Sequence, residues 1–116
     1  MPINPAQAAV SLHTQIDKAA TELLHIIAGG RTFLHLNPRL QELDGHVIAL
    51  VELRDQHFQE VDEVLAGKGL LFMNAFDAVN RILPYALDVP RTDIIELCQH
   101  VHSNLLRLFM PSRMLT

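Results

Sequence analysis

Apolar residues recur at intervals of three and four along four stretches of the chain, which is the spacing of one face of an α-helix. The stretches cover about residues 5–28, 38–66, 70–87 and 93–110, and Gly or Pro residues stand between them. No segment between these marks has the pattern of a β-strand. The pattern predicts an all-α fold in which residues 1–116 form one domain, an antiparallel up-and-down four-helix bundle.

Local signals mark two helix starts and one possible interruption. Asn4-Pro5 and Asn37-Pro38 each combine a side chain that can cap a helix with the fixed φ that suits a first helical position. We therefore expect helices to begin at these two pairs. Pro84 has no amide hydrogen for the carbonyl four residues earlier, so we expect the third helix to kink or to stop there.

Two chemically reactive side chains fall within predicted apolar faces. His13 lies in the apolar arc of the first helix, and Cys98 lies in the apolar seam of the last one. A histidine or a thiol in such a position is more often part of the core than a ligand or a nucleophile. We interpret both as core residues.

One charged residue interrupts the apolar stripe of the longest predicted helix. Arg54 lies one turn from Leu50 and one turn from Phe58, which both belong to the stripe. One interpretation is a side chain that runs along the edge of the core and keeps its guanidinium in water. The other is an arginine at a dimer interface, paired with a carboxylate, that fixes the register of the two chains.

The last two predicted helices carry more apolar surface than one neighbour can cover. Residues 70–87 are apolar around most of the circumference, which is typical of a helix at the centre of a bundle or against a partner. Residues 93–110 have an apolar stripe about half the circumference wide, so this helix can contact two neighbours. We predict that the two helices form a contact surface. Together with Arg54, its candidate residues are Phe72, Met73, Phe76, Leu106 and Phe109.

The composition also favours association with another chain. Apolar residues make up 49% of the chain and charged residues 19%, against about 25% charged residues in an average protein. A small domain has proportionally more surface to cover with polar residues, so the apolar excess is unexpected for a monomer. We therefore expect a homo-oligomer or a helical protein partner.

Other partner classes lack their signals. No apolar run approaches the roughly 20 residues of a membrane span, and the single cysteine agrees with a reducing compartment. These features indicate a cytoplasmic protein without membrane contact. A net charge of −4, no Trp and one Tyr argue against nucleic-acid binding, which needs a basic surface and stacking side chains.

Seven histidines prompt a search for a metal site. Glu22 and His25 have the Glu-x-x-His spacing of carboxylate-bridged di-iron bundles, because residues three apart on a helix present both ligands to one point. Such a site needs this pair twice and facing inward. Here the helical projection turns the pair outward, and His57 with Glu60 has the reverse order. A metal-binding bundle remains a minor alternative, and we expect no metal and no other cofactor.

The expected exposure of His25 permits a second alternative. His25 is followed by two Ile residues, Ala28 and then Gly29-Gly30. This run resembles the phosphoacceptor segment of histidine-phosphotransfer domains, where an exposed helical His precedes apolar residues, a Lys and a small Gly/Ser pair. The resemblance covers six residues and implies a signalling domain that carries phosphate on His25. Ala28 stands where that family has its Lys, and two glycines equally mark the end of a helix.

The sequence contains no recognisable catalytic arrangement. It has no Gly-rich loop between a strand and a helix, and no serine in a nucleophile-elbow context. Glu96 and His100, four residues apart, either hold a surface ion weakly or form an ordinary helix-face pair. We therefore expect a protein that is not an enzyme and that acts as an interaction module, such as an adaptor, a regulator or a chaperone-like bundle.

Overall fold

The computed structural model describes residues 4–30, 33–66, 72–88 and 91–109. These residues form five α-helices and contain no β-strand, so the all-α prediction is confirmed. None of the described helices is both long and apolar enough to cross a lipid bilayer. The helices are α1 (Pro5–Ala28), α2 (Phe33–Gln56), α3 (Phe58–Leu65), α4 (Met73–Asp88) and α5 (Thr92–Phe109).

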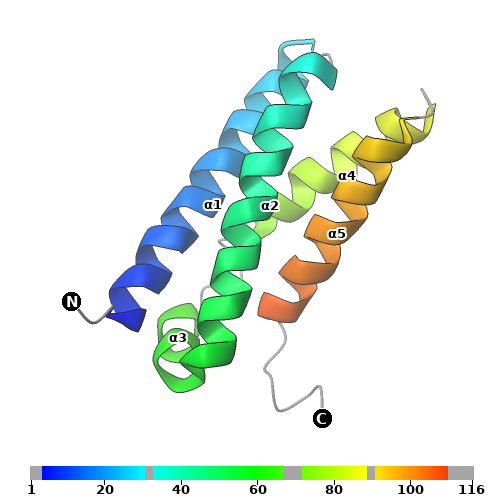
Figure 1. Ribbon diagram of the computed structural model, residues 1–116. Helices are drawn as coiled ribbons and strands as arrows, with labels where there is room; N and C mark the ends of the chain where they lie inside the picture. The colour runs from blue at the N-terminus through cyan, green and yellow to red at the C-terminus, as the bar shows by residue number, and fades with distance from the viewer. Residues whose placement is uncertain (1–3, 31–32, 67–71, 89–90, 110–116) are drawn as a thin grey trace.

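The core lies between the four long helices. Figure 1 shows α1 and α2 side by side along most of their length, with α4 and α5 as a second pair. Helix α1 packs against α2 and α4, and α5 packs against the same two helices, while the short α3 packs against α1 and α2. Completely buried side chains fill the space between them. The largest apolar ones are Ile16, Leu23, Leu36, Leu40, Leu43, Leu50, Phe72, Ile82, Ile94 and Leu105.

Helix α1 begins as the sequence predicts. The side-chain oxygen of Asn4 accepts hydrogen bonds from the amides of Ala6 at 3.0 Å and Gln7 at 3.2 Å. Pro5 follows the cap directly. At the other end the chain leaves the helix through Gly30, whose φ of 81° lies in the left-handed region that glycine adopts without strain. Short-range signals therefore set both ends of this helix.

The predicted helix over residues 38–66 is wrong at its start. Helix α2 begins at Phe33, so Asn37 is not an N-cap and Pro38 lies inside the helix. The five additional residues bring Leu36 into the core, where its side chain is completely buried. Burial of this side chain offsets the helical hydrogen bond that Pro38 cannot donate.

The same predicted helix is also wrong at its end. At His57 the backbone departs from helical geometry, with φ −134° and ψ 60°, and α3 starts in a new direction. A straight helix over residues 33–65 would be about 50 Å long at roughly 1.5 Å per residue, whereas the molecule is 43 Å in its longest dimension. The break returns α3 to α1 and α2 and buries Val61 and Leu65. The described residues therefore form five helices where four were expected.

Pro84 does not end α4. The helix continues through Pro84 to Asp88, so the expected alternative of a stop at this residue is wrong. Pro84 is exposed, and Ala86, two residues further on, is completely buried. Packing of the residues after Pro84 keeps them helical although one hydrogen bond is missing.

Candidate protein-interaction site

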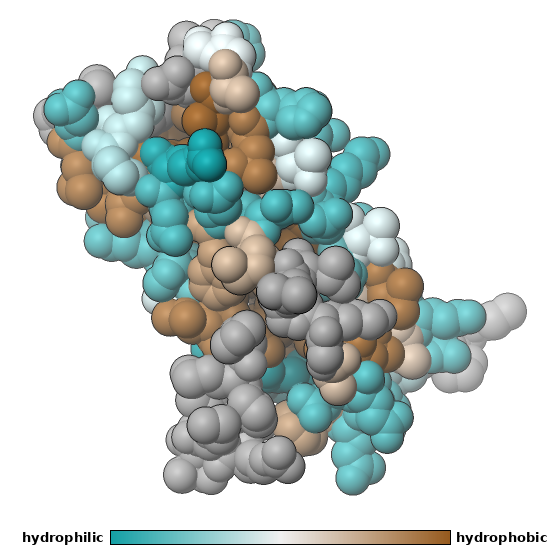
Figure 2. All heavy atoms as spheres, turned by 180° about the vertical axis from the view of Figure 1, so that it is seen from behind, coloured by the Kyte–Doolittle hydropathy of each residue, from teal (hydrophilic) through white to brown (hydrophobic). Residues whose placement is uncertain are grey.

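Exposed apolar side chains concentrate on α4 and α5. Among the described residues, four large apolar side chains are exposed: Leu87 at 60%, Met73 at 53%, Val10 at 47% and Leu106 at 40%. Three of these four belong to α4 or α5. In Figure 2, which shows the molecule from behind, apolar atoms reach the surface in separate groups among polar ones. The spacing of the exposed apolar residues along α4 and α5 shows which of them lie on the same side of each helix.

On α4 these side chains share one side of the helix. Met73, Phe76, Asn80, Leu83 and Leu87 follow one another at intervals of three and four, which keeps them within an arc of about 80°. Phe76 and Leu83 are half-buried at the edge of the core. Asn80 is exposed and is the only polar member of the row.

A second row lies on α5. Ile95, Gln99, His102 and Leu106 are spaced by four, three and four residues and fall within an arc of about 60°. Ile95 and His102 are half-buried, whereas Gln99 and Leu106 are exposed. The two rows together are called the α4–α5 face below.

A groove of about 220 Å³ separates the two rows. The ring of Phe76 meets the ring of His102, which forms part of the groove wall, edge to face at 5.5 Å between centroids. The groove is lined by Val79, Asn80, Leu83, Cys98, Gln99, His102 and Ser103. None of these residues is an acid, a lysine or an arginine, so the groove suits an uncharged occupant.

Comparison with known proteins gives no match. No family model, no curated protein and no solved structure matches the chain. The role of the α4–α5 face is therefore inferred from its own chemistry.

Cys98 lines this groove but offers no nucleophile. Its side chain is completely buried, and burial raises the pKa of the thiol to about 11. The thiol therefore stays protonated at neutral pH, and a protonated thiol reacts slowly. The prediction of a core cysteine is confirmed. His13 is likewise buried, as its position in the apolar arc of α1 predicts.

The predicted contact residues divide into three groups. Met73 and Leu106 are exposed on the α4–α5 face, and Phe76 is half-buried on it. Phe72 instead is buried in the core, where its ring lies edge to face with His13 at 5.4 Å. Its side chain therefore does not contribute to the surface. The side chain of Phe109, the last residue of α5, lies outside the described part of the structure.

Arg54 lies inside the molecule. Its side chain is 2% exposed, and its Nη1 donates a hydrogen bond of 3.2 Å to the carbonyl of Leu108 in the last turn of α5. Burial lowers the pKa of the guanidinium, and the charges of Asp55 and Asp62 act in the opposite direction. An arginine still stays protonated, so it places a positive charge at a helix C-terminus, where the helix dipole favours one. The interpretation with the guanidinium in water is wrong, and a side chain enclosed by its own chain is not available to a second one.

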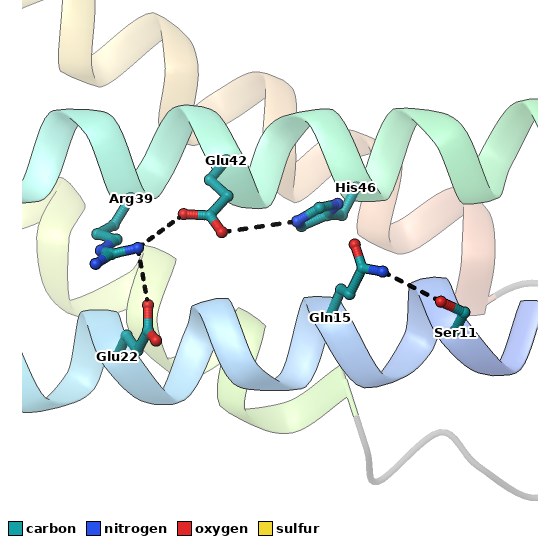
Figure 3. A network of polar contacts seen from close by, with 6 residues as sticks. All are labelled: Ser11, Gln15, Glu22, Arg39, Glu42 and His46. Carbon is teal, nitrogen blue, oxygen red and sulfur yellow. Dashed lines mark hydrogen bonds and ion pairs between the residues drawn. The ribbon is translucent and has the colours of Figure 1, made fainter.

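Glu22 and His25, the predicted metal pair, have different neighbours. Figure 3 shows Glu22 in contact with Arg39. The Glu22 carboxylate on α1 binds Arg39 of α2 at 3.1 Å, and Arg39 also binds Glu42 at 3.0 Å. His46 extends this row at 3.9 Å from Glu42. His25 is exposed in the last turn of α1. Within the described residues, no three His, Cys, Asp or Glu side chains are grouped so that they could hold a metal ion.

One polar cluster was not predicted from the sequence. Asp44 Oδ1 on α2 lies 2.7 Å from Nδ1 of His100 on α5, and the side-chain Nδ2 of Asn104 lies 3.3 Å from Nε2 of the same ring. Both ring nitrogens of His100 therefore lie within hydrogen-bonding distance of a polar side chain. The sequence alone pairs His100 with Glu96, one turn earlier on the same helix. Its partner Asp44 is 56 residues away on another helix, so spacing within one helix does not reveal it. The cluster joins α2 to α5 beside an open hollow of about 440 Å³.

Proposed function

We propose that the protein is a non-enzymatic protein-interaction module that works through the α4–α5 face. The supporting observation is that Met73, Leu87 and Leu106 are exposed along the two rows that flank an uncharged groove. Burial of apolar surface stabilises a complex by roughly 25 cal/mol per Å², so association that covers these side chains is favourable. The proposed role is that of a cytoplasmic adaptor, regulator or chaperone-like bundle, acting without a cofactor, nucleic acid or membrane.

The proposed mode of binding is a helix laid against a groove. Two helices with apolar side chains at intervals of three and four present a surface that accepts the matching side of another helix. The uncharged lining favours a partner helix without charges on its contact side. We propose a homo-oligomer first and a different helical protein second.

We propose that the four long helices form an antiparallel, up-and-down bundle with α3 added at one end. The support for this arrangement is the packing of α1 on α2, α2 on α5, α5 on α4 and α4 on α1. In such a bundle each long helix has two neighbours, and its remaining side faces outward. The α4–α5 face is then an outward side of two adjacent helices.

Sedimentation of the native chain and of three variants tests the proposal. We expect the native chain to be a dimer or a higher oligomer at micromolar concentration. Leu87→Asp and Leu106→Asp each place a carboxylate on the α4–α5 face and should shift the chain towards a monomer. Val10→Asp is the matched control, because Val10 is similarly exposed but lies on α1. A native chain that sediments as a monomer at high micromolar concentration would contradict the proposal.

A second proposal is phosphotransfer through His25. It is supported by the exposure of His25 in the last turn of α1, since a phosphoacceptor must be reachable by its donor. The deciding test is the formation of acid-labile phosphate after exposure to a phosphodonor, with His25→Gln as the variant that should lose it. His35, which is also exposed and helical, provides the control as His35→Gln.

A further inference from the structure

The α4 row has nearly the same pattern in both chain directions. Counted from Asn80, apolar residues lie seven and four positions earlier, at Met73 and Phe76, and three and seven positions later, at Leu83 and Leu87. At roughly 1.5 Å per residue, Met73 and Leu87 each lie about 10 Å from Asn80 along the helix axis. The row therefore has a polar centre and two apolar ends of equal length.

The polar groups at this centre are suited to pairing with a copy of themselves. A carboxamide donates and accepts hydrogen bonds, so two Asn80 side chains can satisfy each other. The Asn80 side chain is exposed, and it makes no hydrogen bond to any other described residue. In addition, Pro84 has no amide hydrogen to donate to the Asn80 carbonyl. Polar groups covered by a partner need hydrogen bonds, so the occupant must bring a matching polar group to this point.

The α5 row also has a polar centre and apolar ends, and its centre lies beside that of the α4 row. Gln99 and His102 lie at its centre, with Ile95 before them and Leu106 after them. Gln99 and His102 line the same groove as Asn80, so the polar centres of both rows lie side by side. One two-fold axis across both helices then brings Ile95 of one chain to Leu106 of the second copy. The same axis brings Gln99 of one chain to His102 of the second copy.

Charge does not oppose such a contact. A two-fold axis brings residues near it close to their own copies, so a charged face would repel itself. The groove lining contains no acid, lysine or arginine. The charged residues of α4 that lie nearest in sequence to Asn80, Asp77 and Arg81, form an ion pair with each other at 3.0 Å.

We propose that the α4–α5 face is occupied by the same face of a second copy of this chain. The two α4 helices run antiparallel, and the two Asn80 side chains pair at the two-fold axis. This inference rests on the proposed function and names the partner of that surface. A second copy brings its own polar centres opposite those of α4 and α5 about one axis, whereas a helix of unrelated sequence has no such built-in match.

Disulfide cross-linking of exposed positions tests the arrangement. A disulfide needs Cβ atoms about 4 Å apart, so Asn80→Cys should form a covalent dimer under mild oxidation. Met73→Cys alone should not, because its two copies are about 21 Å apart along the paired helices. A mixture of Met73→Cys and Leu87→Cys should cross-link between the two variants. Arg81→Cys, also exposed and adjacent in sequence, is the control, and we expect at least a tenfold lower yield from it.

A second variant measures the same contact without a cross-link. Asn80→Asp places two carboxylates at the two-fold axis and should weaken dimerisation at least tenfold at pH 7 in sedimentation, because like charges repel at close range. A dimer with undiminished affinity in this variant would overturn the inference.

The cross-linking outcomes separate this inference from the proposed function. A native dimer in which Met73→Cys cross-links with itself, and Asn80→Cys does not, would overturn the antiparallel arrangement and leave the proposed function in place. A native chain that sediments as a monomer would overturn both.

Discussion

At the scale of single residues, Arg54 combines a charge with a buried position in the apolar core. Burying a cation among apolar side chains costs free energy, and the hydrogen bond to Leu108 offsets part of that cost. The charges of Asp55 and Asp62 act in the same favourable direction, since they raise the pKa that burial lowers. Arg54 therefore links the end of α2 to the end of α5.

Arg54→Leu should leave the free energy of unfolding within about 1 kcal/mol of the native value or raise it, because it removes a desolvated charge and keeps most of the packed volume. Arg54→Ala should lower it by about 2–4 kcal/mol, because it leaves a cavity and removes the donor to Leu108. Denaturant unfolding measures both. Arg107→Ala, which removes an exposed ion pair with Asp55, is the control and should cost about 0.5 kcal/mol or less. Equal losses for Arg54→Leu and Arg54→Ala would show that the hydrogen bond outweighs the packing.

Cys98 gives a prediction about high pH. Its pKa is raised from 9.0 to about 11 by burial, so the folded chain holds the proton where the unfolded chain has released it. Its contribution to stability is thus fully present below about pH 9 and is lost as the pH rises through about 11. Denaturant unfolding of the native chain and of Cys98→Ala from pH 8 to pH 11 should show the native advantage shrinking. An advantage that stays constant would contradict a thiol buried in its neutral form.

At the scale of helices, some boundaries are set by neighbouring residues in the sequence and others by packing against other helices. The sequence predicts α1 correctly because Asn4, Pro5 and Gly30 act on their immediate neighbours. It does not predict the break at His57, because that break depends on Val61 and Leu65 finding the core formed by other helices.

The same distinction applies to the candidate site. Met73, Phe76 and Leu106 follow from helical spacing, and the exposed Leu87 belongs to the same row. Phe72 could not be separated from them, because α4 is apolar around most of its circumference and periodicity then does not identify the inner side. The contact between Asp44 and His100 joins residues on two helices, and no spacing within one helix predicts it.

Helix α4 also yields a prediction about Pro84. Pro84→Ala should raise the free energy of unfolding by about 1–2 kcal/mol, because alanine restores the amide that can bond the Asn80 carbonyl. The gain is reduced because proline also restricts the unfolded chain. Unfolding is measured at one fixed protein concentration. Pro38→Ala, in the second turn of α2, is the matched control and should gain less, since helix ends contribute less than helix interiors. Destabilisation by Pro84→Ala would mean that the ring itself makes packing contacts.

At the scale of the whole molecule, the two pairs of helices present different surfaces. The α1–α2 pair carries an exposed network of charges that includes Glu22, Arg39 and Glu42 (Figure 3). The α4–α5 pair instead presents an uncharged groove with Met73 and Leu106 beside it. A charged network is well hydrated and gains little from a partner, whereas an apolar face gains from being covered. This asymmetry is the reason to expect association on one side of the molecule only.

Association on that side should make thermal stability depend on concentration. If only the folded chain dimerises, mass action stabilises it further as the protein concentration rises. A tenfold increase is worth about 0.7 kcal/mol per chain, which corresponds to roughly 3 °C in the unfolding midpoint of a chain of this size. Calorimetry over a 100-fold concentration range should show this rise for the native chain and for Val10→Asp. Leu106→Asp, with a charge on the α4–α5 face, should unfold at one temperature throughout. A native midpoint that does not change over this range, at scan rates where unfolding is reversible, would contradict a dimer formed by folded chains.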